Sequence, residues 1–361
     1  MGSAIEARTH KGALYNAPGT ISTKIVDLPT PQPKMGEVLI KLTHSGVCHS
    51  DLGVMMQTWD VLPAPTSPDQ VGGHEGVGEV VSLGPGTTEG NIKVEDRVGV
   101  KWVASVCNRC DACLESADGV CYGRTISGYG TPGTFQQYVV GPIDYVTPIP
   151  EGLDSAAAAP MLCAGVTMFA AVRQSGVTCG NWLVVSGAGG GLGHIGVQIA
   201  AKGFGIRVIG IDHPSKQQLV MDSGAEHFID ITKLDGPAII AEVRQLTGGL
   251  GAHATIVVTA NNNAYAQALD MLRFRGTLVC VGVPEGESIP IASAKPSSII
   301  MSQLRITAVN VGNRKDAQEV LDLAARGIVK TVHTVEPLQN LTNIFKRMLE
   351  GQLQGRVVVS I

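Results

Sequence analysis

The sequence contains no apolar run of the ~20 residues that a membrane-spanning helix requires, and no block of like charge. Its 27 lysine and arginine residues are nearly balanced by 31 aspartate and glutamate residues, for a net charge of -4. This balance excludes the basic surface that binds nucleic acids or anionic membranes. Residues 1–11 lack the apolar core of a signal peptide, and residues 357–361 match no lipidation or retention signal. We therefore predict a soluble, cytoplasmic protein with neither nucleic-acid nor membrane partners.

Aromatic residues are also few, at 4% of the chain, whereas glycine occurs 45 times among 361 residues. A chain of this length exceeds one ordinary core, so two domains are expected. The first part predicts irregular β structure, with apolar runs at 38–42, 78–83 and 96–102 and an aperiodic, proline-containing loop at 54–71. From about residue 165, strands alternate with helical segments. That alternation predicts a doubly wound, parallel α/β sheet.

The second pattern continues through apolar segments that read as strands, at 182–186, 207–211, 254–259, 276–282 and 304–308. Helices are expected between them at 195–202 and 264–272. Two amphipathic helices near 315–326 and 338–350 and a strand at 355–360 complete the chain. We assign residues 1–163 and 310–361 to one domain, and residues 164–309 to the α/β domain.

A histidine and a glutamate surrounded by glycines, His74 and Glu75 within Gly72–Gly78, are the centre of the first pattern. Small residues let the backbone approach a buried ion, and imidazole is the commonest protein ligand for zinc. By itself such a pair also fits an ordinary loop. Two distant thiols, Cys48 and Cys163, would complete with His74 a Cys2His set, which is one of the ligand sets of catalytic zinc.

Four of the eight cysteines lie within fifteen residues, in the order Cys107, Cys110, Cys113 and Cys121. Free or disulfide-linked cysteines are the alternative, but close spacing in an intracellular chain favours metal binding. Zinc takes four sulfur ligands in tetrahedral structural sites. Because all four positions would be filled, we predict a structural zinc here and not a catalytic one.

A dinucleotide-binding unit is predicted where the strand 182–186 runs into a glycine-rich loop at 187–193. The helix after the loop presents backbone N–H groups to a pyrophosphate. The next strand closes on Asp212, which is placed to accept the ribose hydroxyls. The pattern Gly191-x-Gly193-x-x-Gly196 would put its last glycine inside the helix. We prefer a loop one residue longer than the common form, formed by Gly187, Gly190, Gly191, Leu192 and Gly193.

The carboxylate of Asp212 also indicates which cofactor is bound. It pairs with free ribose hydroxyls and repels a 2′-phosphate, so it favours NAD over NADP. His213 and Lys216 follow closely enough to soften this preference.

Together these motifs resemble the zinc-dependent medium-chain alcohol dehydrogenase family, most closely its fungal tetrameric type. The resemblance covers nearly the whole chain and includes further stretches at 133–138, 311–314 and 351–356. It implies a GroES-like, irregular β-rich catalytic domain and a Rossmann domain. It also implies a homotetramer with two zinc ions per subunit, one catalytic and one structural, and hydride transfer between NAD and a small alcohol, aldehyde or ketone.

The resemblance further implies a role for each matching residue. The catalytic zinc is held by Cys48, His74 and Cys163, with Glu75 beside it as a transient ligand. Asp51 would accept the other N–H of His74 and so fix the ligand imidazole.

The remaining roles concern the cofactor and the substrate. By resemblance, His49 and Arg356 face the cofactor pyrophosphate, and Ser50 contacts the substrate oxygen and passes its proton outward. Trp59 and Trp102 narrow the substrate pocket. Plain packing is the alternative for each tryptophan.

Two features depart from the fungal pattern. Gly53 stands where a histidine three residues after Ser50 ends the proton relay, and the segment from Cys48 to His74 is about three residues longer. We hypothesise that the proton leaves through water or His49, and that the pocket accepts something other than ethanol.

Two further readings of the whole chain stay open. One is an NADPH-preferring aldehyde or ketone reductase of the same superfamily, which cofactor preference would separate. The other is a zinc-stabilised binding protein without catalysis, which the complete ligand set and Ser50 argue against. A zinc-finger nucleic-acid module is excluded by the acidic balance of the chain and by the absence of clustered Lys and Arg around 107–121.

Overall fold

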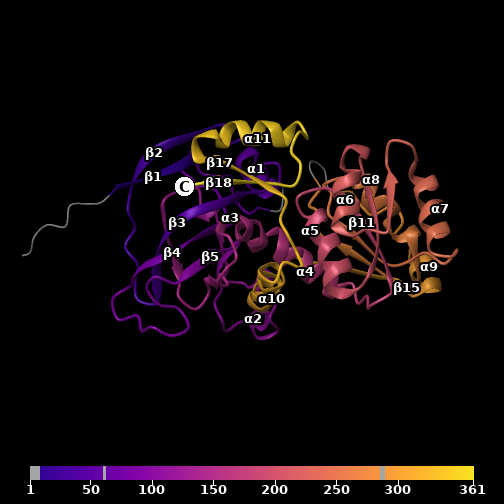
Figure 1. Ribbon diagram of the computed structural model, residues 1–361, viewed down its shortest axis with the longest axis horizontal. Helices are drawn as coiled ribbons and strands as arrows, with labels where there is room; N and C mark the ends of the chain where they lie inside the picture. Colours follow the sequence, from indigo (N-terminus) through magenta and orange to yellow (C-terminus); the bar gives the residue numbers. More distant parts are fainter. Residues whose placement is uncertain (1–8, 60–61, 285–288) are drawn as a thin grey trace, which may run out of the picture. The chain divides into compact units, whose positions relative to one another are not determined.

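The structure is a computed structural model that describes residues 9–59, 62–284 and 289–361 (Figure 1). The described chain divides into two compact units. The first contains the residues up to Cys163 together with Asn313–Leu321 and Val332–Ile361. The second contains Ala164–Gly312 and Asp322–Thr331.

The first unit is built on a seven-stranded sheet in the order β10-β5-β4-β3-β18-β17, with β9 also paired to β3. The strands are β3 (Glu37–Val47), β4 (Gly76–Leu83), β5 (Arg97–Val100), β9 (Tyr138–Pro142), β10 (Thr147–Pro148), β17 (His333–Pro337) and β18 (Arg356–Ser360). Alternate residues of β3 are buried in an aliphatic core with residues of β4, β5 and β9. The sequence predicted strands at the positions of β3, β4, β5 and β18, but not β9, β10 or β17.

Smaller elements cover this sheet. A two-stranded sheet joins β1 (Thr9–Tyr15) and β2 (Thr23–Pro29), and a three-stranded sheet joins β6 (Val103–Ser105), β7 (Thr125–Ser127) and β8 (Gly130–Thr131). The amphipathic helix α11 (Leu341–Leu349) packs against the first unit. The ring centroids of its Phe345 and of Phe135 are 6.3 Å apart. Figure 1 shows α11 beside β1 and β2. The irregular, β-rich unit predicted from the sequence is present in the structure.

The second unit contains a parallel six-stranded sheet in the order β13-β12-β11-β14-β15-β16. Its strands are β11 (Trp182–Ser186), β12 (Arg207–Asp212), β13 (His227–Asp230), β14 (Ala252–Val257), β15 (Leu272–Cys280) and β16 (Arg305–Ala308). Helices lie around the sheet in Figure 1: α4 (Ala164–Gln174), α5 (Gly193–Gln198), α6 (Gln217–Ser223), α7 (Gly236–Leu246), α8 (Asn262–Ala268) and α9 (Pro296–Ser302). The prediction of a doubly wound Rossmann sheet is confirmed, although β13 was not predicted.

One prediction about local structure is wrong. The prolines and lack of periodicity predict an irregular loop at 54–71, but helix α1 (His49–Met56) extends into that stretch. Val54 and Met55 are fully buried, so packing favours one more helical turn before the first proline, Pro63. Residues 60 and 61 of the same stretch lie outside the described residues.

Among the described residues, no single helix is long and apolar enough to cross a membrane. The segments Ser155–Leu162 and Ala164–Gln174 reach the required length and composition only when they are counted together.

Candidate metal and cofactor sites

Three strand ends of the large sheet meet at one place in the first unit. Cys48 follows β3, Glu75 precedes β4 and Arg356 begins β18, and β3 pairs with both of the other strands. His74 is adjacent to Glu75 in the chain, and Cys163 follows a short 3-10 turn. The sheet therefore gathers chemically reactive residues that are far apart in the sequence.

Cys48, His74, Glu75 and Cys163 form a buried cluster in which one ligand atom of each lies within 4.8 Å of all the others. None of these residues is more than 6% exposed. His74 Nε2 and Glu75 Oε2 are buried without a hydrogen-bond partner in the described part of the chain. Such orphaned atoms cost about 1–3 kcal/mol each unless something binds them. Two thiols and an imidazole suit catalytic zinc, so the residues present fit this ion.

Asp51, on the first turn of α1, orients two members of the cluster. Its Oδ1 lies 2.7 Å from His74 Nδ1, and its Oδ2 accepts the backbone N–H of Cys48 at 2.9 Å. An acceptor at Nδ1 favours the tautomer with hydrogen on that nitrogen, which leaves the lone pair of Nε2 for a metal. The contact expected for Asp51 is therefore present in the structure.

We expect Asp51→Asn to weaken zinc binding and activity by about 10–100-fold, the range found for partners of metal-ligating histidines. An asparagine replaces one of the two carboxylate oxygens by an NH2 donor, which would then face either His74 Nδ1–H or the Cys48 N–H. Zinc content after dialysis and kcat/KM would measure the effect. Asp69→Asn removes an exposed carboxylate from the same region and is the matched control. Equal zinc retention in both variants would contradict the orienting role of Asp51.

Glu75 is fixed on the other side of the cluster by an ion pair with the buried guanidinium of Arg356. Burial raises the pKa of Glu75 to about 7, although the Arg356 cation opposes this shift. A Cβ at residue 46 would overlap Glu75 Oε2, so Gly46 makes room for the carboxylate. No sequence pattern indicates this role of Gly46, because it depends on the pairing of β3 with β4.

The two thiols of the cluster influence one another. A hydrogen bond with Cys163 lowers the pKa of Cys48, and the same bond raises the pKa of Cys163. Cys48 is also the N-cap of α1, where the helix dipole favours a thiolate. Zinc binds cysteine in this deprotonated form.

The first turn of α1 carries the residues that were predicted to serve the substrate and the cofactor. Ser50 is half-buried, with its Oγ 3.6 Å from Cys48 Sγ, so it lies beside the cluster. His49 precedes it and is exposed.

Two tryptophans extend from the cluster. The ring of Trp102 lies edge-on to His74 at 4.8 Å between centroids, and Trp59 lies 6.1 Å from Trp102. A Cβ at residue 53 would lie 2.9 Å from Trp59 Nε1, which is tighter than side chains accept. Gly53 therefore provides the space that the indole of Trp59 fills.

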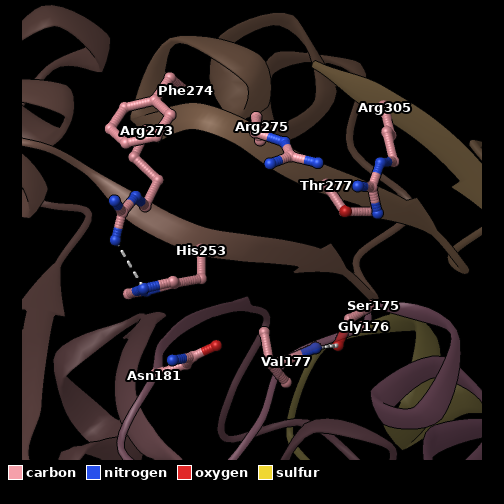
Figure 2. Close-up of a pocket in the computed structure, with 10 residues that line it drawn as sticks. All are labelled: Ser175, Gly176, Val177, Asn181, His253, Arg273, Phe274, Arg275, Thr277 and Arg305. Atoms are coloured by element: carbon pink, nitrogen blue, oxygen red, sulfur yellow. Dashed lines mark hydrogen bonds between the residues drawn. The ribbon is translucent and has the colours of Figure 1, made fainter. Parts of the chain in front are cut away.

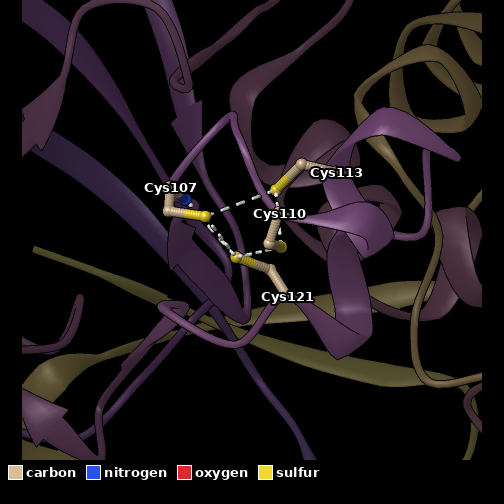
Figure 3. Close-up of side chains that lie close together, drawn as sticks. All are labelled: Cys107, Cys110, Cys113 and Cys121. Atoms are coloured by element: carbon tan, nitrogen blue, oxygen red, sulfur yellow. Dashed lines mark hydrogen bonds between the residues drawn. The ribbon is translucent and has the colours of Figure 1, made fainter.

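The four cysteines from 107 to 121 converge on one point (Figure 3). Sulfur–sulfur separations among them include 3.6 Å, for Cys110–Cys113 and Cys107–Cys121, and 4.0 Å, for Cys107–Cys113. A tetrahedron with Zn–S bonds of about 2.3 Å has edges of roughly 3.8 Å. None of the four is in a disulfide. Their arrangement therefore fits a closed, four-sulfur zinc site.

The glycine-rich loop of the second unit joins β11 to α5. Gly187 has φ +88°, which favours glycine, and a Cβ at Gly193 would overlap the carbonyl oxygen of Gly187. Gly191 and Leu192 lie half-buried between them, and Gly190 donates its N–H to Gly187 O at 3.1 Å. Gly196 lies inside α5 against Met168, where it serves helix packing.

Asp212 ends β12 beside this loop. Its carboxylate accepts the N–H of Gly189 at 2.7 Å and that of His213 at 2.7 Å. A Cβ at Gly189 would lie 2.5 Å from Cβ of Lys216, so Lys216 packs against the loop. Gly189 was not among the predicted residues. The glycine run could have indicated it, but only the contacts with Asp212 and Lys216 distinguish it from its neighbours.

Comparison with known families matches both units. Residues 34–151 match the alcohol dehydrogenase GroES-like domain, and residues 191–326 match the zinc-binding dehydrogenase family. The chain is 57% identical to alcohol dehydrogenase 2 of Emericella nidulans over 359 residues, which is 98% of each protein. It is 38% identical to an alcohol dehydrogenase of Schizosaccharomyces pombe, covering 95% of each.

Solved structures of similar fold include an acetophenone reductase from Geotrichum candidum in complex with NAD. It has a TM-score of 0.84 and 27% identity, and the match covers 100% of this chain and 99% of the other. A cinnamyl alcohol dehydrogenase from Sorghum bicolor has a TM-score of 0.83 and 27% identity, over 98% of both chains.

Proposed function

Because the chain belongs to the zinc-dependent medium-chain alcohol dehydrogenase family, we propose that it is an NAD-dependent enzyme that interconverts alcohols with aldehydes or ketones. The buried cluster of Cys48, His74 and Cys163, with the unpaired Nε2 of His74, carries this proposal. A zinc-stabilised protein without catalysis would need only the four-cysteine site. Stabilising the fold does not require a second buried ligand set beside a half-buried serine, so this set favours catalysis.

We assign two zinc ions to each chain, one to Cys48, His74 and Cys163, and one to the cysteines from 107 to 121. When bound, zinc in the first site supplies a Lewis acid that lowers the pKa of an alcohol. NAD supplies the hydride acceptor. Glu75, with its pKa near 7 and its Arg356 partner, is placed as the transient ligand.

The residues around the cluster bind and orient the substrate. The Oγ of Ser50 contacts the substrate hydroxyl and takes its proton, which then leaves through water or His49. Trp59 and Trp102 form the wall next to His74 and exclude water from the reacting atoms. Because Trp59 occupies the space beside Gly53, we propose a pocket suited to an alcohol other than ethanol.

Cofactor roles follow the loop geometry. The glycine loop with Leu192 would hold the pyrophosphate, and Asp212 would hold the ribose hydroxyls. Lys216 would contact the adjoining face of the cofactor. His49 and Arg356 are assigned to the pyrophosphate by family resemblance. The carboxylate of Asp212 is fixed by two backbone N–H groups, which supports a preference for NAD.

Initial rates with NAD⁺ and NADP⁺ over primary, secondary and aromatic alcohols test this proposal. We expect kcat/KM with NAD⁺ to exceed that with NADP⁺ by at least about tenfold, since a 2′-phosphate beside Asp212 would be repelled. A preference for NADP(H) would instead support the reductase alternative, for which the neighbouring Lys216 is the favourable observation. No turnover of any alcohol or carbonyl with either cofactor would contradict the assignment as an enzyme.

We further propose that residues 1–163 with 310–361 form the catalytic domain and residues 164–309 the cofactor domain, and that the protein is a homotetramer. Edge pairing of the cofactor-domain sheets would build the oligomer. Exposed apolar residues near the sheet edge support such pairing. On the edge strand β16, Ile306 is 43% exposed, and on α9 Ile300 is 70% and Met301 83% exposed.

A further inference from the structure

A cavity of about 410 Å³ lies at the edge of the second unit's sheet where the strands begin. Its lining comes from the segment before β11, the start of β14, the first half of β15 and the start of β16. The glycine loop follows the carboxyl end of β11. Because the strands are parallel, the cavity lies at their amino ends and the glycine loop at their carboxyl ends, on opposite sides of the sheet. The cavity is therefore separate from the predicted cofactor site.

A large bulge in β15 forms one wall of this cavity. Ala252 pairs with Leu272, and Ala254 pairs with Thr277, so one residue of β14 faces four of β15. Bulges of this kind redirect side chains and are frequent beside binding sites. Arg275, within the bulge, has φ +61°, an unusual backbone conformation for a side chain of this size. Such strain persists where the surrounding structure requires it.

The bulge and its neighbour strand bring three arginines to the same cavity. Arg273 and Arg275 come from β15 and Arg305 from β16, and Figure 2 shows Arg275 and Arg305 above Thr277. In the described part of the chain, none of the three guanidinium groups pairs with a carboxylate. Elsewhere in this unit, Arg207 forms an ion pair with Glu226, and Arg326 forms one with Asp322.

Among the residues that the structure describes, the hydrogen-bond partner of the Arg273 guanidinium is a histidine. Its Nη1 lies 2.8 Å from His253 Nε2, while the backbone N–H of Trp182 points at His253 Nδ1 at 3.0 Å. Partial burial and the Arg273 cation lower the pKa of His253, so its ring is neutral. A neutral imidazole accepts at only one nitrogen. The lone pair of that nitrogen serves either Trp182 or Arg273, so His253 uses at most one N–H of the Arg273 guanidinium and does not neutralise its charge.

Within the described residues these three guanidinium groups share one concave surface without a carboxylate partner, and they concentrate positive potential there. Arginine presents its N–H groups in a fork that matches phosphate oxygens. The volume also lies within the range of small-ligand pockets. We propose that this arginine cavity binds a small molecule that carries a phosphoryl group, at a site separate from the cofactor and the catalytic cluster.

Calorimetric titration with inorganic pyrophosphate tests the proposal. Saturating NADH keeps the glycine loop occupied, so that binding there is not measured. We expect one pyrophosphate site per chain, and an affinity at least about tenfold lower in the double variant Arg275→Gln/Arg305→Gln. Arg326→Gln, which removes one exposed charge from the same unit outside the cavity, should leave the affinity unchanged.

Three results would overturn the proposal: no pyrophosphate binding at millimolar concentration, equal binding by the double variant, or the same loss in Arg326→Gln. Light scattering on the same proteins tests a competing role. A change of oligomeric state with unaltered pyrophosphate affinity would mean that the arginines meet a second copy of the chain, and the proposal would be wrong. Since the arginines are outside the catalytic cluster, alcohol oxidation by the double variant should persist and demonstrates that it is folded.

Discussion

Replacing Cys163 with alanine is expected to lower kcat/KM for alcohol oxidation by at least about a thousandfold, which corresponds to about 4 kcal/mol of transition-state stabilisation. The thiol is 6% exposed and shares the cluster with Cys48 and His74. Without it, only two strong ligands remain, and zinc supplies several kcal/mol of charge stabilisation in such reactions. Bound zinc should fall from two ions per chain to one, as measured by elemental analysis.

The matched control is Cys280→Ala, which removes a half-buried thiol of β15 that belongs to neither cysteine cluster. That variant should keep both zinc ions and its activity within about twofold, since a half-buried thiol outside both clusters contributes packing only. Full activity and two zinc ions in Cys163→Ala would show that the buried cluster is not the catalytic metal site.

The second large effect is expected on stability. Cys110→Ala should lower the melting temperature of the protein by about 10 °C, because a closed four-sulfur zinc site contributes folding free energy directly. A loss of about 3–4 kcal/mol corresponds to such a shift for a domain of this size. The four-cysteine segment is also tied to α10 (Arg314–Ala325) through Ser116 and Asp118, so loosening it affects more than the segment itself.

Two measurements separate this effect from damage to catalysis. Below the melting transition, kcat of Cys110→Ala should stay within about threefold of the unaltered protein, since the closed site has no position for substrate. Cys179→Ala, at an exposed cysteine outside both clusters, should leave melting unchanged. An unaltered melting temperature with one zinc lost would mean that the four-sulfur site has no structural role.

The grouping of the four cysteines from 107 to 121 could be predicted because close ligand spacing is visible in the sequence itself. Four thiols within fifteen residues are close together in the chain, and four of their sulfur–sulfur distances lie between 3.6 and 4.0 Å. The parallel sheet was equally predictable, since its strands are short apolar segments between helical ones. The distant set of Cys48, His74 and Cys163 could be proposed only by combining residue type with family resemblance.

What the sequence did not reveal depends on packing between distant segments. Gly46 clears space for Glu75 only because β3 lies beside β4, and Arg356 reaches Glu75 only because β18 pairs with β3. Trp59 explains Gly53 through a contact that has no signature in the chain. The bulge in β15 likewise depends on its register with β14. Periodicity and composition carry no information on such contacts.

The most direct test of the account combines zinc content with activity. The purified protein would be treated with a chelator until it retains one zinc ion per chain, then assayed for NAD⁺ reduction with its best alcohol before and after zinc is added. Activity should disappear with the loss of the first zinc ion and return as the second is restored. Undiminished activity in protein that lacks zinc at Cys48, His74 and Cys163 would contradict the central claim.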